Sequence, residues 1–321
     1  MAIRRKQVAS VIGLSAVLTL TLAACGGANN ASSADGESGS VRIDGSSTVY
    51  PLTAVAAEDF QIANPGVRVT VGSSGTGGGF EKFCRGETDA NDASRPIKED
   101  EIANCEASGI VFSPLTLAID ALTVVVNQDN DWATCLTTDQ LAQVWGPDST
   151  VSNWNEIDPA FPDEPIALFG PGTDSGTFDY FTEEINGESG ASRTDFTPSE
   201  DDNVIVQGVS GSKGGLGYFG FSYFEENIDQ LKAVAIDSGA GCIQPSVETA
   251  RDGSYTPLSR PLYVYVSQPA LENPAVLNFF QFFVDNNASI AESALFIPLS
   301  EEGQTQLTTD FTALIPPSGT E

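Results

Sequence analysis

Short apolar runs that alternate with helical patterns from residue 41 onward limit the fold of this chain more than any other feature. Such alternation is typical of an α/β fold with a largely parallel sheet. The predicted strands are residues 41–43, 67–71, 110–112, 122–126, 166–169, 233–236 and 262–266. The predicted helices are residues 52–62, 80–85, 98–107, 138–145, 178–185 and 275–284.

Residues 1–24 have the layout of a secretory signal, with basic residues at positions 4–6 and an apolar run over residues 8–22. The run is short and interrupted for a membrane span, so we expect cleavage. Small residues leading into Cys25 resemble the lipobox of bacterial lipoproteins, in which this cysteine receives the lipid. The alternative is a plain signal peptide. Residues 25–40 carry no large apolar side chain, so we expect a flexible tether there.

The chain after residue 24 carries 11 basic and 44 acidic residues, a net charge of −33. This charge excludes nucleic acid as a partner. It also repels anions from a distance, so an anion site must depend on short-range hydrogen bonds and local dipoles.

The chain contains no histidine. Ser-His-Asp catalysis and ordinary zinc sites are therefore excluded, and we expect no cofactor and no metal.

Four cysteines remain once Cys25 is assigned to lipid, and an even number in an exported chain indicates two disulfides. Four cysteines allow three pairings. We favour Cys84 with Cys105, which closes a local loop in one lobe, and Cys135 with Cys242 in the other. Buried free thiols are the alternative.

Residues 121–128 and 261–268 are two similar β-rich segments that each end in a polar turn. We interpret them as two strands that cross between lobes and form a hinge. Lobe 1 is then residues 41–124 plus 267–321, and lobe 2 is residues 125–266. Periodicity alone allows the alternative that both are core strands of a single sheet.

Three clusters of Gly, Ser and Thr lie between a strand-like run and a helical pattern, at residues 45–48, 72–76 and 172–177. Such clusters can direct backbone N–H groups and hydroxyls at an anion from a helix N-terminus, where the dipole also favours negative charge. A single cluster can equally be an N-cap. Three clusters on both sides of the first crossing predict an anion-binding cleft.

Five short motifs follow one another in the chain: GSSTVYP at 45–51, GSSG at 72–75, DASRPI at 92–97, GPGTDSGTF at 170–178 and GGLGYFG at 214–220. In order and spacing they resemble the phosphate-binding lipoproteins of Pst-type ABC transporters. The resemblance implies a two-lobed periplasmic-binding-protein fold (type II) that binds dehydrated phosphate in its cleft. It further implies a monomer, lipid-anchored to the outer face of the cytoplasmic membrane, that delivers phosphate to a permease with its ATPase.

The family's ligand positions carry over to the Thr48 hydroxyl, the Val49 backbone N–H and Ser73, and to Ser175, Gly176 and Thr177 at a second-lobe helix. Two positions depart from the family pattern. Ser94 stands where the best-known members have an aspartate that accepts the phosphate proton, and Pro171 stands where they have an arginine. Asp92 and Asp174 are the nearest substitute acceptors, and Arg95 is the expected substitute cation.

Two other functions remain open at this point. Asp174-Ser175-Gly176-Thr177 matches the core motif of aspartic proteases, but the chain lacks the second copy that would supply a carboxylate pair. We therefore predict no catalytic residues and no enzyme. The fold could also serve a binder or sensor of another oxyanion that has no transporter partner.

Overall fold

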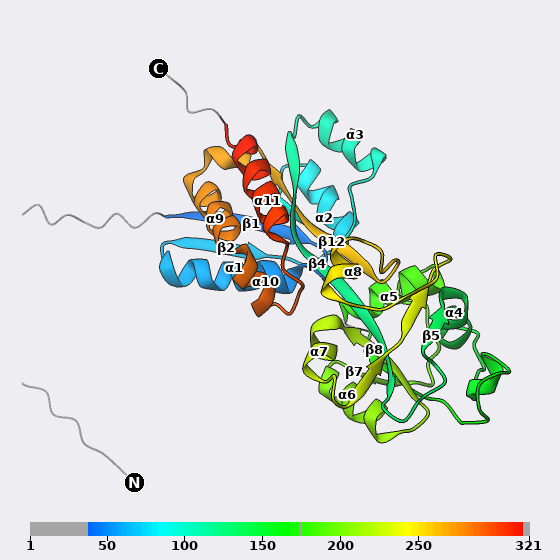
Figure 1. The fold of residues 1–321 in the computed structure, drawn as a ribbon. Helices are drawn as coiled ribbons and strands as arrows, with labels where there is room; N and C mark the ends of the chain where they lie inside the picture. Colours follow the sequence, from blue (N-terminus) through cyan, green and yellow to red (C-terminus); the bar gives the residue numbers. More distant parts are fainter. Residues whose placement is uncertain (1–37, 174, 317–321) are drawn as a thin grey trace, which may run out of the picture. The chain divides into compact units, whose positions relative to one another are not determined.

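A computed structural model describes residues 38–173 and 175–316. The predictions for the signal, for Cys25, for most of the tether and for Asp174 therefore concern residues outside the described ranges. Within these ranges, a curled nine-stranded sheet has the order β2-β1-β3-β12-β4-β8-β6-β7, and β9 also pairs with β4 (Figure 1). The strands are β1 Gly39–Gly45, β2 Val67–Val71, β3 Ala90–Ala93, β4 Phe112–Asn127, β6 Ala167–Pro171, β7 Thr197–Ser199, β8 Gly215–Gly220, β9 Leu231–Ala233 and β12 Ser259–Ser267. A small second sheet has the order β11-β10-β5, formed by β5 Cys135–Thr137, β10 Ala235–Asp237 and β11 Cys242–Ile243.

The first lobe is built on β2, β1, β3, β12 and the first half of β4. One face of these strands is covered by four helices, α1 Tyr50–Ala63, α9 Pro274–Asp285, α10 Asn287–Ser293 and α11 Glu301–Leu314. The other face is covered by α2 Gly75–Cys84 and α3 Glu99–Ala107. In β1 and β2 buried apolar residues alternate with exposed polar ones, Val41 and Ile43 with Arg42, and Val67 and Val69 with Arg68. These two strands therefore bury mainly the face that packs on α1 and α9.

The second lobe is built on the second half of β4 together with β8, β6, β7 and β9. Leu122, Val124 and Val126 point to a core with α4 Thr138–Trp145 and α5 Gly176–Asn186. Ala121 and Val125 point to the opposite core, whose helices are α6 Asp202–Gly211, α7 Phe221–Glu226 and α8 Val247–Arg251. The α/β class and the two-lobed architecture are thus confirmed.

Two of the predicted strands, 110–112 and 122–126, belong to a single 16-residue strand, β4. It pairs with β12 from Phe112 to Ala121 and with β8 from Leu122 to Val126. A polar residue, Asp120, lies in the middle of this run, which is why the apolar pattern looked interrupted.

The structure places β12 with the first lobe over most of its length. Leu262, Val264 and Val266 pack into the core with α1 and α9, and β12 pairs with β3 from Tyr263 to Val266. The sequence had assigned residues up to 266 to lobe 2. The difference arises because an apolar strand pattern does not reveal which sheet a strand joins.

Both predicted disulfides are present, Cys84 with Cys105 and Cys135 with Cys242. The first joins α2 to α3 in the first lobe, and the second joins β5 to β11 in the second lobe. Each bridge therefore stays within one lobe. In the described part of the chain, no helix is long and apolar enough to span a bilayer.

Candidate functional site

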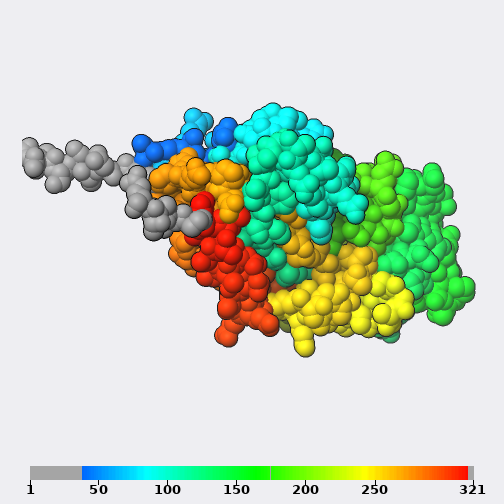
Figure 2. Space-filling view, turned by 90° about the horizontal axis from the view of Figure 1, so that it is seen from above, coloured from blue at the N-terminus to red at the C-terminus, as the bar shows by residue number. Residues whose placement is uncertain are grey.

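A cavity of about 340 Å³ lies between the two lobes. Its first-lobe wall comes from three segments. Residues 46–48 follow β1, residues 75–76 begin α2, and residues 94–95 follow β3. Its second-lobe wall comes from α5 and the residues that follow it, namely Asp179, Tyr180, Glu183, Glu184 and Ser189. Figure 2 shows, from above, the cyan surface of α2 and α3 next to the green surface of the second lobe. Arg260, at the start of β12, completes the lining.

Three helices begin beside this cavity. The N-cap of α1 is Val49, that of α2 is Ser74, and that of α5 is Ser175, whose Oγ accepts a hydrogen bond from the Thr177 N–H at 3.2 Å. Helix N-termini carry partial positive charge and unpaired N–H groups. The arrangement can therefore hold an anion without a cluster of cations.

The loop before α1 and the start of α5 are in close contact. A Cβ on Gly176 would lie 2.9 Å from Thr48 Oγ1 and 3.1 Å from Thr48 Cα. A side chain at position 176 would require Thr48 to shift, so glycine allows these two segments their close approach. The structure thus brings together two of the sequence clusters, although they are 128 positions apart.

Arg95 lies at the first-lobe edge of the cavity, but its guanidinium is already paired. Nη1 and Nη2 donate to the two carboxylate oxygens of Glu101 at 2.8 and 2.7 Å, and Nη1 also donates to the Pro96 carbonyl oxygen. Burial would raise the pKa of Glu101, but the hydrogen bonds from Arg95 and from the Lys98 N–H hold that pKa below its ordinary value. The carboxylate that pairs with Arg95 is therefore Glu101.

Asp92 lies behind the first-lobe wall and does not reach the cavity lining. Its side chain is fully buried, and one carboxylate oxygen accepts a hydrogen bond from Thr53 Oγ1 at 3.0 Å. Burial raises the pKa of this carboxyl to about 8, and the nearby charge of Asp44 adds to the increase, while the Thr53 bond opposes it. Asp92 therefore supports the first-lobe wall from below and does not line the cavity.

The predicted residues divide into three groups. Thr48, Ser94 and Arg95 line the cavity. Val49, Ser175, Gly176 and Thr177 adjoin it at the starts of α1 and α5. Ser73 is exposed and does not line the cavity, whereas its neighbour Ser74 donates through N–H and Oγ to Asp44.

Sequence reasoning missed several lining residues. Ser46, Ser47 and Thr76 lie in the Gly, Ser and Thr clusters, so the clusters themselves could have indicated them. Thr76 Oγ1 lies 3.2 Å from Ser94 Oγ, which joins the second and third loops. Little in the sequence indicated Arg260. It is one of the 11 basic residues after position 24, and it stands directly before the second β-rich segment.

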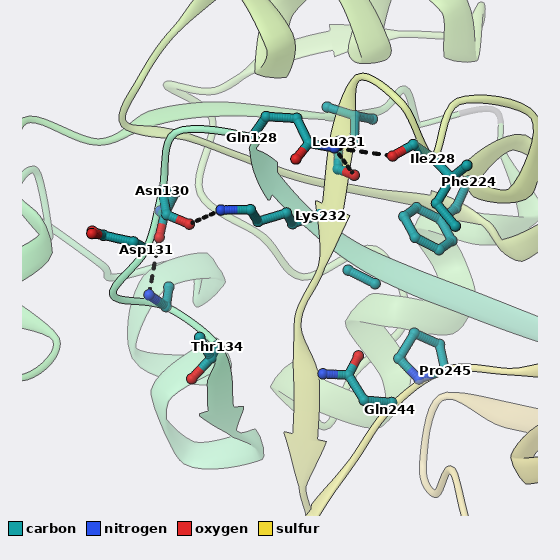
Figure 3. A pocket seen from close by; sticks show the side chains of 12 residues that line it. Gln128, Asn130, Asp131, Thr134, Phe224, Ile228, Leu231, Lys232, Gln244 and Pro245 are labelled. Atoms are coloured by element: carbon teal, nitrogen blue, oxygen red, sulfur yellow. Dashed lines mark hydrogen bonds between the residues drawn. The ribbon is translucent and has the colours of Figure 1, made fainter.

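A larger cavity, of about 560 Å³, lies in the second lobe around the end of β4 and β9 (Figure 3). Phe224, Ile228 and Leu231 give it an apolar side. Its lining lysine, Lys232, donates to the Asn130 carbonyl oxygen at 3.0 Å. This lining suits an oxyanion less well than the interlobe cavity does, because it offers no helix N-terminus and no row of hydroxyls. Within residues 38–173 and 175–316, no group of three or more Cys, Asp or Glu side chains is placed to hold a metal ion.

Comparisons with known proteins agree with this geometry. A model of the PBP superfamily domain matches residues 30–287, which defines the class of protein. The chain is 48% identical to the SphX protein of Synechocystis over 82% of this chain and 79% of that protein. It is 40% identical to the phosphate-binding protein PstS of Staphylococcus saprophyticus over 90% of this chain and 89% of that protein.

A solved structure gives the same result. A possible phosphate-binding protein from Planctomyces limnophilus superposes with a TM-score of 0.84 at 45% identity, and the match covers 87% of this chain and 99% of that one. Within the PBP superfamily, the chain therefore belongs to the family of Pst-type phosphate-binding proteins.

Proposed function

We propose that this protein binds inorganic phosphate in the interlobe cavity and delivers it to an ABC permease with its ATPase. The observation that supports this most directly is the contact of Thr48 with Gly176, which brings two helix N-termini and a row of hydroxyls to one point between the lobes. The names of the relatives, SphX and phosphate-binding protein PstS, point to the same ligand.

Short-range donors suffice for this task even on an acidic protein. Hydrogen bonds to a charged group contribute about 1.5 to 3 kcal/mol each, and a helix end adds about 0.3 to 1 kcal/mol. Micromolar affinity requires about 8 kcal/mol net of association costs. The proposed donors are the hydroxyls of Thr48, Thr76, Ser94, Ser175 and Thr177 and the backbone N–H groups of Val49 and Gly176.

The lobes are proposed to close on phosphate about β4 and the segment before β12. We place the two crossings near residues 121 and 258, where β4 exchanges its partner β12 for β8 and where Leu258 packs in the second-lobe core. Small-angle scattering tests the closure, because saturating phosphate should lower the radius of gyration.

The remaining proposals concern where and how the protein works. It is exported, lipid-anchored through Cys25, monomeric and without catalytic activity. A Cys25→Ser change should release it from membranes into the soluble fraction, and equal membrane retention would contradict the anchor.

Calorimetry of the domain with phosphate, arsenate, sulfate and molybdate tests the function. Phosphate should bind at micromolar Kd or tighter, and more tightly than sulfate. Because Ser94 and Pro171 replace two family ligand residues, a preference for another oxyanion is the specific alternative, and no binding of phosphate would refute the proposal.

A further inference from the structure

Arg260 lines the interlobe cavity and contacts both lobes. Its side chain is only 14% exposed. Nη2 donates to Thr48 Oγ1 in the first lobe at 3.1 Å, and Nε donates to Asp120 on β4 at 3.4 Å. Cζ lies 3.4 Å from the centroid of the Tyr180 ring on α5, a stacking contact between a cation and an aromatic face.

Tyr180 and Asp120 hold this guanidinium in place. Tyr180 is almost fully buried, and its hydroxyl donates to the Pro257 carbonyl oxygen at 2.6 Å. Asp120 is buried beside β12, which pairs with β4 at this position. A planar group that is stacked on one face and bonded at one edge keeps a fixed orientation, so little further entropy is lost when it binds a ligand.

The two arginines of the cavity differ in how much of their charge is already neutralised. Arg95 makes a two-pronged salt bridge with Glu101 at 2.7 and 2.8 Å. Arg260 has a single, longer contact with one carboxylate oxygen of Asp120. Among the residues that the structure describes, the hydrogen bonds of Arg260 use Nε and Nη2, so Nη1 keeps its capacity for a ligand oxygen.

We propose that Arg260 is the cation that binds the phosphate charge, directly through Nη1 and indirectly through the Thr48 hydroxyl. This inference rests on the proposed function. A hydroxyl that accepts a hydrogen bond from a cation becomes a stronger donor, and Thr48 is then free to direct its own proton at the anion. Because Arg260 contacts Thr48 in one lobe and Tyr180 in the other, the same residue joins both walls around the ligand.

The role of Arg260 is distinct from that of the arginine that the family pattern places at position 171. The present chain has Pro171 there, in the described end of β6. Arg260 reaches the site from the start of β12 rather than from the end of β6. Arg260 thus supplies a positive charge at the site, which this sequence lacks at position 171.

The test compares Arg260→Gln and Arg260→Lys with Arg95→Gln, the matched control in the same cavity. Calorimetry should show phosphate binding about 100-fold weaker in Arg260→Gln and about 10-fold weaker in Arg260→Lys, because lysine keeps the charge but not the planar fork. Arg95→Gln should weaken phosphate binding less than Arg260→Gln does, because the Arg95 guanidinium is already paired with Glu101.

Thermal melting shows whether Arg260→Gln folds. If it does not, Thr48→Val is the second variant to measure. It removes the relay oxygen but leaves the guanidinium, so binding should weaken by about 10-fold. Tyr180→Leu, which removes the ring under Arg260, should weaken phosphate binding, and Tyr180→Phe, which keeps the ring, should have a smaller effect.

The outcomes separate the two proposals. If the wild type binds no phosphate, the proposed function fails and the inference fails with it. If the wild type binds phosphate and a folded Arg260→Gln binds within threefold of it, only the inference is overturned. A larger loss in Arg95→Gln than in Arg260→Gln would assign the charge to Arg95 instead.

Discussion

The first-lobe wall of the cavity presents hydroxyls and two helix N-termini, whereas the second-lobe wall combines the N-terminus of α5 with the carboxylates of Asp179, Glu183 and Glu184. A phosphate therefore meets donors from both lobes, but carboxylates only from the second lobe. The contrast indicates that affinity is generated at short range, where hydrogen bonds act, and that the acidic wall acts mainly at longer range. Four predictions test this division, from the largest expected effect to the smallest.

The largest effect should come from keeping the two walls apart. In Gly176→Ala the new Cβ would press on Thr48 Cα and N at 3.1 and 3.2 Å, so the start of α5 and the first-lobe loop would have to move apart. We expect phosphate binding about 100-fold weaker, or nearly 3 kcal/mol. Gly220→Ala is the matched control, because its φ is −60° and a Cβ there meets no atom within 4 Å. Unchanged calorimetric affinity in Gly176→Ala would show that the walls need not touch.

The second prediction concerns the support of the first-lobe wall. Because burial raises the pKa of Asp92 to about 8, far above the value of about 4 expected in the unfolded chain, the folded state holds a proton that the unfolded state has lost. This contribution is complete below pH 4 and is lost as the pH rises toward 8.

Chemical denaturation at several pH values measures this loss. Between pH 6 and 7.5 the wild type should lose about 2 kcal/mol of unfolding free energy that Asp92→Asn does not lose. The amide side chain in Asp92→Asn has the same shape as the carboxylate and can still accept the hydrogen bond from Thr53, so the variant removes the titrating group without removing this contact. Parallel pH curves for the two proteins would mean that Asp92 is ionised in the folded state.

The third prediction separates two candidate donors of the first-lobe wall. The family equivalence assigns Ser73, which is exposed, whereas the geometry favours Thr76, which lines the cavity and contacts Ser94. Thr76→Val should weaken phosphate binding by about 10-fold, and Ser73→Ala should leave it within twofold. The reverse order in calorimetry would restore the family assignment.

The smallest effect should come from the acidic wall. Removing one charge with Glu183→Gln should speed phosphate association by about twofold at low salt, and the gain should vanish at high salt because exposed charges are screened. Stopped-flow kinetics at two salt concentrations measures it. A slower association in the variant would mean that Glu183 assists binding.

Much of the fold could be read from the sequence because it depends on local patterns. The strands of residues 67–71 and 166–169 and the helix at 138–145 follow directly from apolar periodicity and capping residues, as at Thr137. The disulfides followed from the even cysteine count and from keeping each bridge within one predicted lobe.

The site was read less completely, because its long-range parts leave no local pattern. Arg260 reaches Thr48 across 212 positions, and nothing near residue 260 indicates that contact. The pairing of Arg95 with Glu101 was missed for a different reason. Glu101 lies six residues away on α3, and an acidic surface offers many equally near carboxylates. The apolar pattern of β12 could not show to which lobe this strand belongs, because its pairing with β3 and β4 depends on the whole sheet.

One consequence of β4 concerns cooperativity. Its 16 residues run without a break from the first-lobe sheet into the second, so unfolding either lobe would strip hydrogen-bond partners from the strand on which the other depends. Calorimetric melting should therefore give one endotherm whose van't Hoff and calorimetric enthalpies agree. Amide protons of Leu122 to Val126 should exchange only through that global event, while those of the short edge strand β7 exchange earlier through local opening.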